Sequence, residues 1–372
     1  MLSLEFLQIY WWCVVSLLGG LLVFMMFVQG GQTLLFGLCK NELQKDMVIN
    51  SIGRKWELTF TTLVMFGGAC FAAFPLFYAT SFGGAYWVWL AILFCFILQA
   101  VSYEYRKKPD NFLGQKTYEI FLFINGSLGV ILIGMAVSTF FSGSDFLLNE
   151  HNFVQWQTPF RGLEALGNIM LYPLGIAVFF LSRVGGALYL INNIDDEEIR
   201  ANARKAALKN TILFLPFFLA FAAWVLSKPG FGYDEAGEVS VVAFKYARNF
   251  ADMPIIAVAA VAGVCGVLFG VFKGAFTKSI YGIVPFGAGV VLVVTALFLI
   301  SGLNGTAFYP SFSDLQSSLT IKNASSSRYT LNVMFYVSFL VPVVLGYIVA
   351  VWRAMDSKKI TASEIERDHH AY

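Results

Sequence analysis

The sequence predicts an all-α integral membrane protein, a single polytopic domain over residues 1–372 with nine transmembrane helices. The first observation is composition: 58% of the residues are hydrophobic and only 13% are charged. A soluble domain has about 25% charged residues, so this chain could not cover its surface in water. The second observation is a series of apolar runs about 20 residues long. The third is that basic residues gather in alternate connections between these runs.

A helical hairpin near the N-terminus is the clearest element. Its apolar runs, residues 57–80 and 85–105, are separated by a short turn without charge. A helix that rises 1.5 Å per residue needs about 20 residues to cross a ~30 Å hydrocarbon layer, so each run can span a membrane. Arg54 and Lys55 precede the pair and Arg106 follows it. Because basic residues stay in the cytoplasm during insertion, the hairpin is expected to enter and leave from that side.

The remaining spans follow from the same count of apolar windows. The first run has no basic leader and no small-residue cleavage site, so it is expected to be retained as a helix. Two longer outer loops, residues 227–253 and 303–330, are rich in Pro, Gly, Ser and Asn and are expected to cap the bundle. In chain order, the expected spans cover residues 7–36, 57–80, 85–105, 118–141, 163–191, 206–226, 254–272, 281–301 and 331–352.

The distribution of positive charge predicts the orientation. Eighteen of the 25 Lys and Arg residues fall in one set of alternate loops and six in the other, while Arg183 lies inside the fifth span. This threefold bias predicts an N-terminus outside and a C-terminus in the cytoplasm, which requires an odd number of spans. The net charge is only +2, so a nucleic-acid partner is not expected.

The sequence lacks the residues that most cofactor and catalytic sites need. No histidine lies in an expected span: His151 is in an outer loop, and His369 and His370 are in the terminal tail. Haem in a membrane bundle usually takes axial ligands from His or Met on the helices, so redox centres are expected in a partner chain. The ten methionines are far more often apolar filler than ligands. Five scattered cysteines without a C-x-x-C pair predict neither disulfides nor a metal site.

Polar residues near the cytoplasmic ends of the first three spans are the candidate site. Polar groups within a membrane are costly, so each is a functional candidate by default. Gln29 and Gln32 share one helical face because they are three residues apart. One interpretation is a hydrated half-channel that brings protons in from the cytoplasm, and the other is ordinary polarity at helix ends. The candidates are Gln29, Gln32, Trp56, Glu57, Gln99, Ser102 and Glu104.

Arg183 poses a separate question. Inside the fifth span it must find a carboxylate, a carbonyl or water, unless the helix ends close by and the side chain extends to the interface. Glu164 is expected to open the same helix on the outer side, where a negative charge suits the helix dipole.

A family resemblance follows from short motifs that occur in order along nearly the whole chain. The chain resembles subunit II of cytochrome bd-type quinol oxidases. The motifs are Tyr10-Trp11-Trp12, Met47 to Gly53 followed by Trp56, Gly67-Gly68-Ala69, Phe71 to Pro75, Tyr103-Glu104-Tyr105-Arg106, Ser317 to Ile321, Thr330 to Met334, and Ile360-Thr361 with Ile365 to Arg367.

The resemblance implies a partner and a reaction. Subunit I of this family holds two b-type haems and one d-type haem, and the complex oxidises quinol on the outer side and reduces dioxygen to water with protons from the cytoplasm. It implies a place in the bacterial inner membrane. Subunit II is expected to ligate no haem, to stabilise subunit I, to help conduct protons and, in some members, to hold a structural quinone. Which quinone is used, and whether a small accessory subunit attaches, stays open.

Departures from the family pattern replace charge by amides. The family commonly has D-G-F-D where this chain has Gln29-Gly30-Gly31-Gln32, W-D-G-N where it has Trp56 to Thr59, and F-R-P where it has Leu98-Gln99-Ala100. Losing acids and base together avoids leaving an unpaired buried ion. Gln cannot titrate.

We therefore expect Glu57 and Glu104 to be the only members of the cluster that titrate. Gln29, Gln32, Gln99 and Ser102 would order water around them, with Trp56 and Arg106 as structural neighbours. A secondary transporter and a purely structural membrane subunit are the alternative functions.

Overall fold

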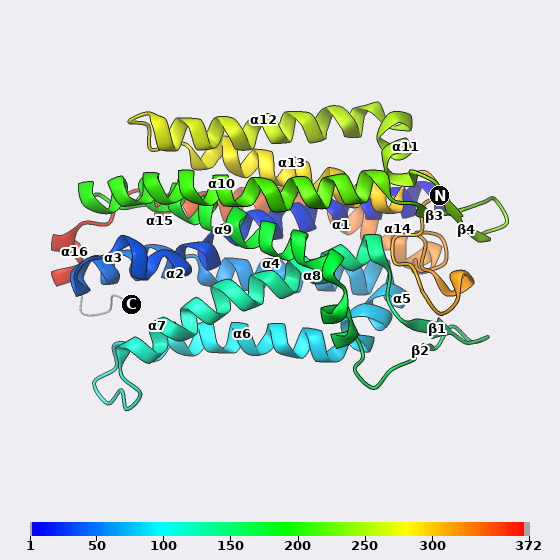
Figure 1. Cartoon of the computed structure of the whole chain (residues 1–372), viewed down its shortest axis with the longest axis horizontal. Coiled ribbons are helices and arrows are strands. Elements are labelled where there is room, and N and C mark those ends of the chain that lie inside the picture. The colour runs from blue at the N-terminus through cyan, green and yellow to red at the C-terminus, as the bar shows by residue number, and fades with distance from the viewer. Residues whose placement is uncertain (1, 368–372) are drawn as a thin grey trace.

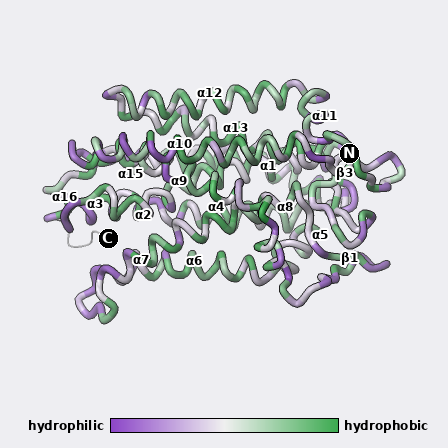
Figure 2. The backbone as a smooth tube through the Cα atoms, in the orientation of Figure 1, coloured by the Kyte–Doolittle hydropathy of each residue, from purple (hydrophilic) through white to green (hydrophobic). Residues whose placement is uncertain are grey.

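Long helices lie side by side along the long axis of the computed structural model, which describes residues 2–367 (Figure 1). Within these residues, nine helical segments are long and apolar enough to cross a membrane. Hydrophobic residues dominate the middle of the bundle and hydrophilic residues its two ends (Figure 2). These features confirm the expected all-α class with nine candidate membrane spans in the described residues.

The first span is one long run broken at a single residue. Helix α1 (Leu4–Met25) leads into α2 (Phe27–Leu38) through Met26. Helix α3 (Glu42–Gly53) follows and was not expected, because its mixture of charged and apolar residues gives no apolar window. Asn41 starts it by accepting a hydrogen bond from the backbone N–H of Gln44.

The second span ends earlier than predicted. Helix α4 (Trp56–Ala73) stops before Pro75, which has no N–H to donate and starts the short α5 (Pro75–Tyr78). A π-helical turn, Ala79–Gly84, then leads into α6 (Tyr86–Tyr105).

The fourth and fifth spans are separated by irregular structure at the far end of the bundle. Helices α7 (Gln115–Ile124) and α8 (Val130–Ser142) are joined by a π turn, Asn125–Gly129. A two-stranded hairpin, β1 (Phe146–Leu148) with β2 (Val154–Trp156), follows.

The fifth helix, α9 (Tyr172–Asn193), starts later than residue 163. Gly162 adopts a left-handed conformation (φ 98°) and two 3₁₀ turns, Leu163–Gly167 and Ile169–Leu171, come first. Pro173 then fixes the first turn of α9.

The second half of the chain forms four further spans and their connections. They are α10 (Glu197–Ser227), the hairpin β3 (Gly230–Tyr233) and β4 (Val239–Val242), α11 (Lys245–Asp252), α12 (Pro254–Phe276), α13 (Ile283–Gly302), a 3₁₀ turn at Leu315–Ser317, α14 (Arg328–Ser338), α15 (Val341–Met355) and α16 (Ala362–Arg367).

Glycines bring α2 and α9 close together at the centre of the bundle. A Cβ at Gly30 would meet the backbone of Ser182, and a Cβ at Gly186 would meet the backbone of Gly31. Such close approach is how helices pack without a hydrophobic driving force in lipid. In contrast, α15 has no buried residue.

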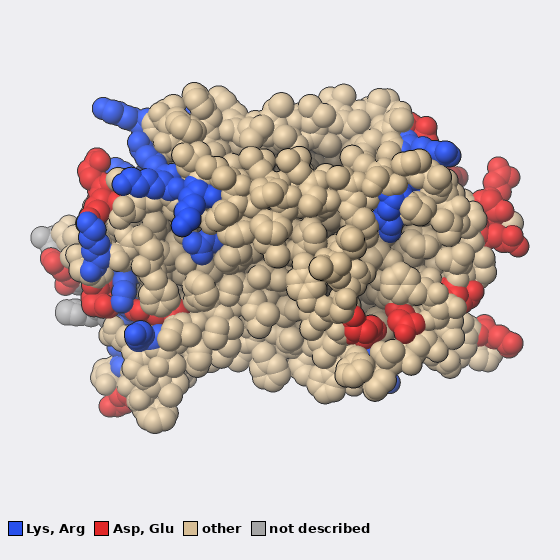
Figure 3. All heavy atoms as spheres, in the orientation of Figure 1, with Lys and Arg blue, Asp and Glu red and all other residues tan. Residues whose placement is uncertain are grey.

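The beginning of α1 and the last described helix, α16, lie at opposite ends of the bundle (Figure 1), as an odd number of spans requires. Basic side chains gather at the end that carries α3 and α16 (Figure 3). We call this the basic end.

Candidate functional site

A buried layer of glutamine amides connects α2 and α6 toward the basic end. The Gln29 side-chain N–H₂ donates to Gln99 Oε1 at 3.3 Å, and that of Gln32 donates to the Tyr103 hydroxyl at 3.0 Å. The three glutamines are at most 1% exposed. The structure therefore brings these sequence-predicted residues together.

Several amide atoms in this layer have no hydrogen-bond partner. They are Gln29 Oε1, Gln32 Oε1 and Gln99 Nε2, together with both amide atoms of buried Asn125. Asn125 begins the π turn that packs on α2 beside Gln29. Buried polar atoms are almost always paired with protein or water, so this layer is suited to ordered water. An Asn within an apolar run was the signal that could have added Asn125 to the candidates.

The two expected titrating residues lie outside the layer. Glu57 and Glu104 are exposed, and Glu104 pairs with Lys108 at 3.2 Å. Among the described residues, neither carboxylate makes a hydrogen bond or ion pair with a glutamine of the layer. The expectation that these acids converge with the amides is thus corrected: α4 and α6 turn Glu57 and Glu104 away from α2.

Of the remaining candidates, Trp56 contacts the layer, whereas Ser102 bonds within its own helix. The Ser102 hydroxyl donates to the Leu98 carbonyl at 2.6 Å, so it satisfies its own helix. The ring of Trp56 stacks on Tyr103, with 5.9 Å between centroids and 15° between planes. Trp56 thereby holds the hydroxyl that Gln32 bonds.

Arg106, expected as a structural neighbour of this layer, has charged partners that the sequence reasoning missed. Arg106, 1% exposed, lies 2.7 Å from Asp46 and 2.8 Å from Glu119, which is also 1% exposed. Lys45 pairs with Glu119 at 3.2 Å and Lys107 with Asp46 at 3.0 Å. We call these five residues the α3–α7 ion network. The carboxylate of Glu119, at the start of an apolar run, was the feature of the sequence that could have indicated this network.

A second buried pair fastens the last span to the bundle. Lys55 is fully buried and donates to Asp356 Oδ1 at 2.9 Å. Asp356 also accepts from the Tyr189 hydroxyl at 3.2 Å and from Asn193 at 3.1 Å. The end of α15 is therefore held by charge and hydrogen bonds rather than by burial.

Arg183 is a structural cation inside the bundle. Helix α9 continues to Asn193, so the guanidinium does not extend past a helix end. It donates to Asn210 Oδ1 at 2.7 Å and to the hydroxyl and carbonyl of Thr33 at 2.9 and 3.2 Å. The sequence suggested a carboxylate, a carbonyl or water as the partner of Arg183. The structure provides the carbonyl of Thr33, together with the neutral side chains of Thr33 and Asn210.

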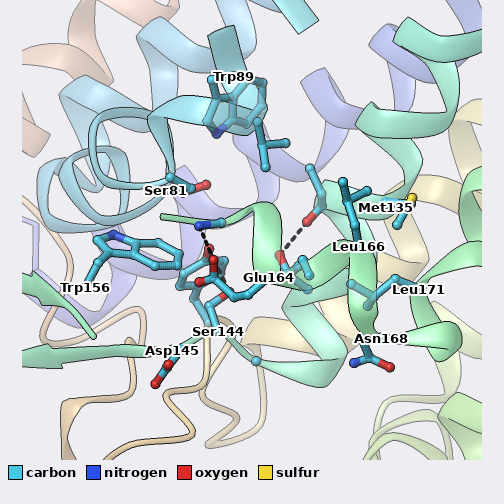
Figure 4. Close-up of a pocket in the computed structure, with 18 of the residues that line it drawn as sticks. Ser81, Trp89, Met135, Ser144, Asp145, Trp156, Glu164, Leu166, Asn168 and Leu171 are labelled. Atoms are coloured by element: carbon cyan, nitrogen blue, oxygen red, sulfur yellow. Dashed lines mark hydrogen bonds between the residues drawn. The ribbon is translucent and has the colours of Figure 1, made fainter. Parts of the chain in front are cut away.

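A pocket of about 380 Å³ opens at the end opposite the basic end (Figure 4). Its walls come from α6, α8, the 3₁₀ turns before α9 and the loop before β1. Apolar groups such as Trp89, Met135 and Leu171 line much of it, and Ser81, Asn168 and Glu164 add polar atoms. This size is typical of small-molecule sites.

Glu164 is the chemically notable group of this outer pocket. One carboxylate oxygen accepts the backbone N–H of Gly162 at 2.8 Å, while the other, Oε1, is buried without a partner. The sequence placed Glu164 at the start of the fifth helix, but it lies on the 3₁₀ turn Leu163–Gly167. The carboxylate can thus accept a hydrogen bond from a hydroxyl or ammonium group in the pocket.

The sequence matches a known protein family over almost its whole length. The family described as cytochrome bd terminal oxidase subunit II matches residues 7–355. The chain belongs to this family. It is similar to cytochrome bd-I ubiquinol oxidase subunit 2 of Escherichia coli K12, at 28% identity over the full length of both chains. It is also similar to the probable cytochrome oxidase subunit 2 of Haemophilus influenzae, at 28% identity over both full lengths, and to cytochrome bd ubiquinol oxidase subunit 2 of Bacillus subtilis, at 28% over 82% of each.

A solved structure shares the architecture of this bd-family chain. The bd oxidase from Geobacillus thermodenitrificans superposes with a TM-score of 0.64 at 13% sequence identity, covering 95% of this chain and 99% of the other. At this identity the match shows the fold. Together with the family, it identifies a multi-pass membrane protein that is a subunit of a respiratory quinol oxidase.

Proposed function

We propose that this chain is the haem-free subunit II of a cytochrome bd complex, paired with a haem-bearing subunit I. The complex oxidises quinol and reduces dioxygen to water in the bacterial inner membrane. The observation that carries the proposal is the family match over residues 7–355 on a bundle of matching fold.

The residues present do not fit a haem within this chain. His151 is exposed in the β1–β2 turn, outside every span, and the remaining two histidines lie outside the described residues. Haem iron in a membrane bundle would need ligands on the helices. The two b-type haems and the d-type haem are therefore assigned to subunit I.

The orientation proposed for the complex places the basic end in the cytoplasm and the outer pocket on the opposite side. The support is the threefold excess of Lys and Arg in one set of loops. The N-terminus is then outside and the C-terminus inside.

A role in proton uptake is proposed for the glutamine layer. Its amide atoms without partners favour water, and Gln itself cannot ionise. Glu57 and Glu104, exposed at the cytoplasmic surface, would take up protons there, and water held by Gln29, Gln32 and Gln99 would carry them inward. Since the acids do not touch the amides, water must join the two sets.

The outer pocket is proposed as the place of the structural quinone that this family holds in some members. The partnerless oxygen of Glu164 accepts a hydrogen bond, so it favours a hydroxyl group over a carbonyl. The pocket therefore fits the reduced quinol better than the oxidised quinone. Replacing Glu164 by Gln adds donors and should reverse this preference, which extraction and redox typing of the bound quinone would measure.

One purification tests the main proposal. A tag on this chain should bring down a second, haem-coloured chain, and the complex should consume oxygen when given quinol. Mass spectrometry of the same sample shows whether a small accessory subunit is attached. A colourless monomer that moves a solute would instead identify a secondary transporter.

A further inference from the structure

An apolar slot runs between α10 and α12 over α13. It contains two adjoining cavities of about 150 and 360 Å³ that share Phe218, Val264, Val293 and Leu297. Every residue of their linings is apolar. Along α10 the lining runs from Phe214 to Leu226, about 18 Å at 1.5 Å per residue.

The slot is too small for a protein helix. A helix with its side chains is about 10–12 Å across, whereas these cavities hold the volume of an extended chain. Because the exposed sides of α10 and α12 are apolar along the span, the slot opens toward hydrocarbon. An acyl chain is the occupant that fits both the shape and the surroundings.

Basic side chains mark one end of the slot. Lys209 is five residues before Phe214 on α10, and Lys273 is five residues after Leu268 on antiparallel α12. Along the helix axes both therefore lie about 7.5 Å beyond the slot lining at the same end, turned about 140° around each helix from that lining residue. Further cations at this end are Arg204, Lys205 and Lys278, and Figure 3 shows basic side chains gathered over these ends of α10 and α12.

Acidic side chains of the described residues do not neutralise these cations. Within residues 2–367, none of the five forms an ion pair, and Arg204 Nε is buried without a partner. The acids at the start of α10 are engaged elsewhere: Asp195 pairs with Arg200, and Glu198 pairs with Lys40. Asp196, which accepts the backbone N–H of Ile199 as the cap of α10, and Glu197, exposed in the first turn, are the two acids there without an ion pair among the described residues.

The opposite end of the slot has fewer cations: besides Lys228, α11 carries Lys245 and the exposed Arg248, together with Asp252. Lys228, which follows α10, turns inward to the Phe141 carbonyl and lies 4.9 Å from the Trp224 ring. Its charge is thus directed into the protein.

We propose that the slot binds an anionic phospholipid of the leaflet at the basic end. One acyl chain occupies the slot, and the phosphate lies among the five cations. Clusters of Lys and Arg beside transmembrane helices attract anionic headgroups in this way.

Lipid binding to the purified complex tests this proposal. The complex is isolated through a tag on this chain, stripped of lipid in detergent, and titrated with dioleoyl phosphatidylglycerol or phosphatidylcholine, and bound lipid is counted by native mass spectrometry. Phosphatidylglycerol should bind more tightly than phosphatidylcholine. The double variant Lys209→Gln/Lys273→Gln should weaken phosphatidylglycerol binding roughly thirtyfold.

Two matched controls separate headgroup and chain effects. Lys116→Gln/Lys358→Gln removes two exposed charges of the same end away from the slot and should leave binding unchanged. Val264→Phe fills the slot and should abolish binding. Val258, also on α12, is 68% exposed and does not line the slot, so Val258→Phe should leave binding unchanged. Equal affinity for both lipids, unchanged binding in Lys209→Gln/Lys273→Gln or Val264→Phe, or a small protein occupying the slot would overturn the proposal. Haem content and monodispersity confirm that each variant complex is assembled.

Discussion

The guanidinium of Arg106 lies 2.8 Å from the carboxylate of Glu119, and both side chains are only 1% exposed. This pair ties the end of α6 to α7, and Asp46 adds α3 to the same cation. Removing one partner of a buried ion pair leaves the other charge poorly compensated. The resulting loss of stability is larger than the net stabilisation that the intact pair provides. The α3–α7 ion network therefore makes a specific prediction.

Glu119→Gln should destabilise the protein by roughly 1–3 kcal/mol, because Arg106 and Lys45 lose a buried partner while Arg106 keeps the more exposed Asp46. Glu104→Gln is the matched control: its exposed pair with Lys108 is worth less than about 1 kcal/mol. Thermal unfolding of the purified complex measures both. If the two variants unfold alike, the network does not hold α6, α7 and α3 together.

Glu57→Gln and Glu104→Gln should each slow quinol-driven oxygen consumption if these carboxylates admit protons. Loss of a proton-transferring group costs roughly tenfold or more. Glu5→Gln, at the other end of the bundle, should have no effect. Unchanged turnover and unchanged proton uptake in a Glu57 variant would remove that residue from the path and leave this chain a structural role.

Gly186→Ala should impair assembly, because the added Cβ would meet the backbone of Gly31 on α2. Backbone cannot yield as a flexible side chain does, so we expect a cost of roughly 1–3 kcal/mol. Gly68→Ala is the control, since a Cβ there meets nothing within 4 Å. The yield of assembled complex and its unfolding temperature are the measurements. Equal behaviour of the two variants would show that α2 and α9 do not depend on contact through glycine.

The stability of the outer end should depend on pH through Lys228. Burial lowers the pKa of this amine from 10.5 to about 8. Between these values the unfolded chain binds more protons than the folded one, so stability rises with pH from about 8 to about 10.5. Below pH 8 the amine is charged in both states, and this contribution is constant.

Lys228→Met should remove that dependence. The difference in unfolding free energy between the two proteins should change by roughly 3 kcal/mol across the window. Unfolding at pH 7.5 and at pH 10 measures it. Parallel pH curves for wild type and variant would contradict the assignment.

The sequence predicted the spans but not where their polar groups point. Apolar runs set the nine segments because backbone in lipid must satisfy its hydrogen bonds within a helix. Pro75 and Gly162 shifted two boundaries through local backbone preferences that an apolar window does not register. Helix α3 was missed because a mixed helix has no such window.

The sequence predicted the glutamines of the candidate site but not the orientation of its acids. Spacing placed Gln29 and Gln32 on one face, and the structure joins them to Gln99 and Tyr103. A shared depth at the cytoplasmic ends of the spans suggested that Glu57 would accompany them. The rotation of α4 about its axis decides this instead, and the weak amphipathicity of α4 gave no indication of it. The pair of Arg106 and Glu119 depends on packing between α6 and α7, which a single sequence does not reveal.

Helix α10 has 31 residues, a length of about 46 Å, which is some 16 Å more than the hydrocarbon core of a bilayer. Its first three turns therefore stand as a rigid rod beyond the lipid tails, where Glu198 bonds Lys40 and Gln44. The rod carries Arg200, Arg204 and Lys205, whose burial in hydrocarbon would be costly, so these charges set the depth of α10 in the bilayer. A thicker membrane would have to thin locally around α10 rather than cover its first turns.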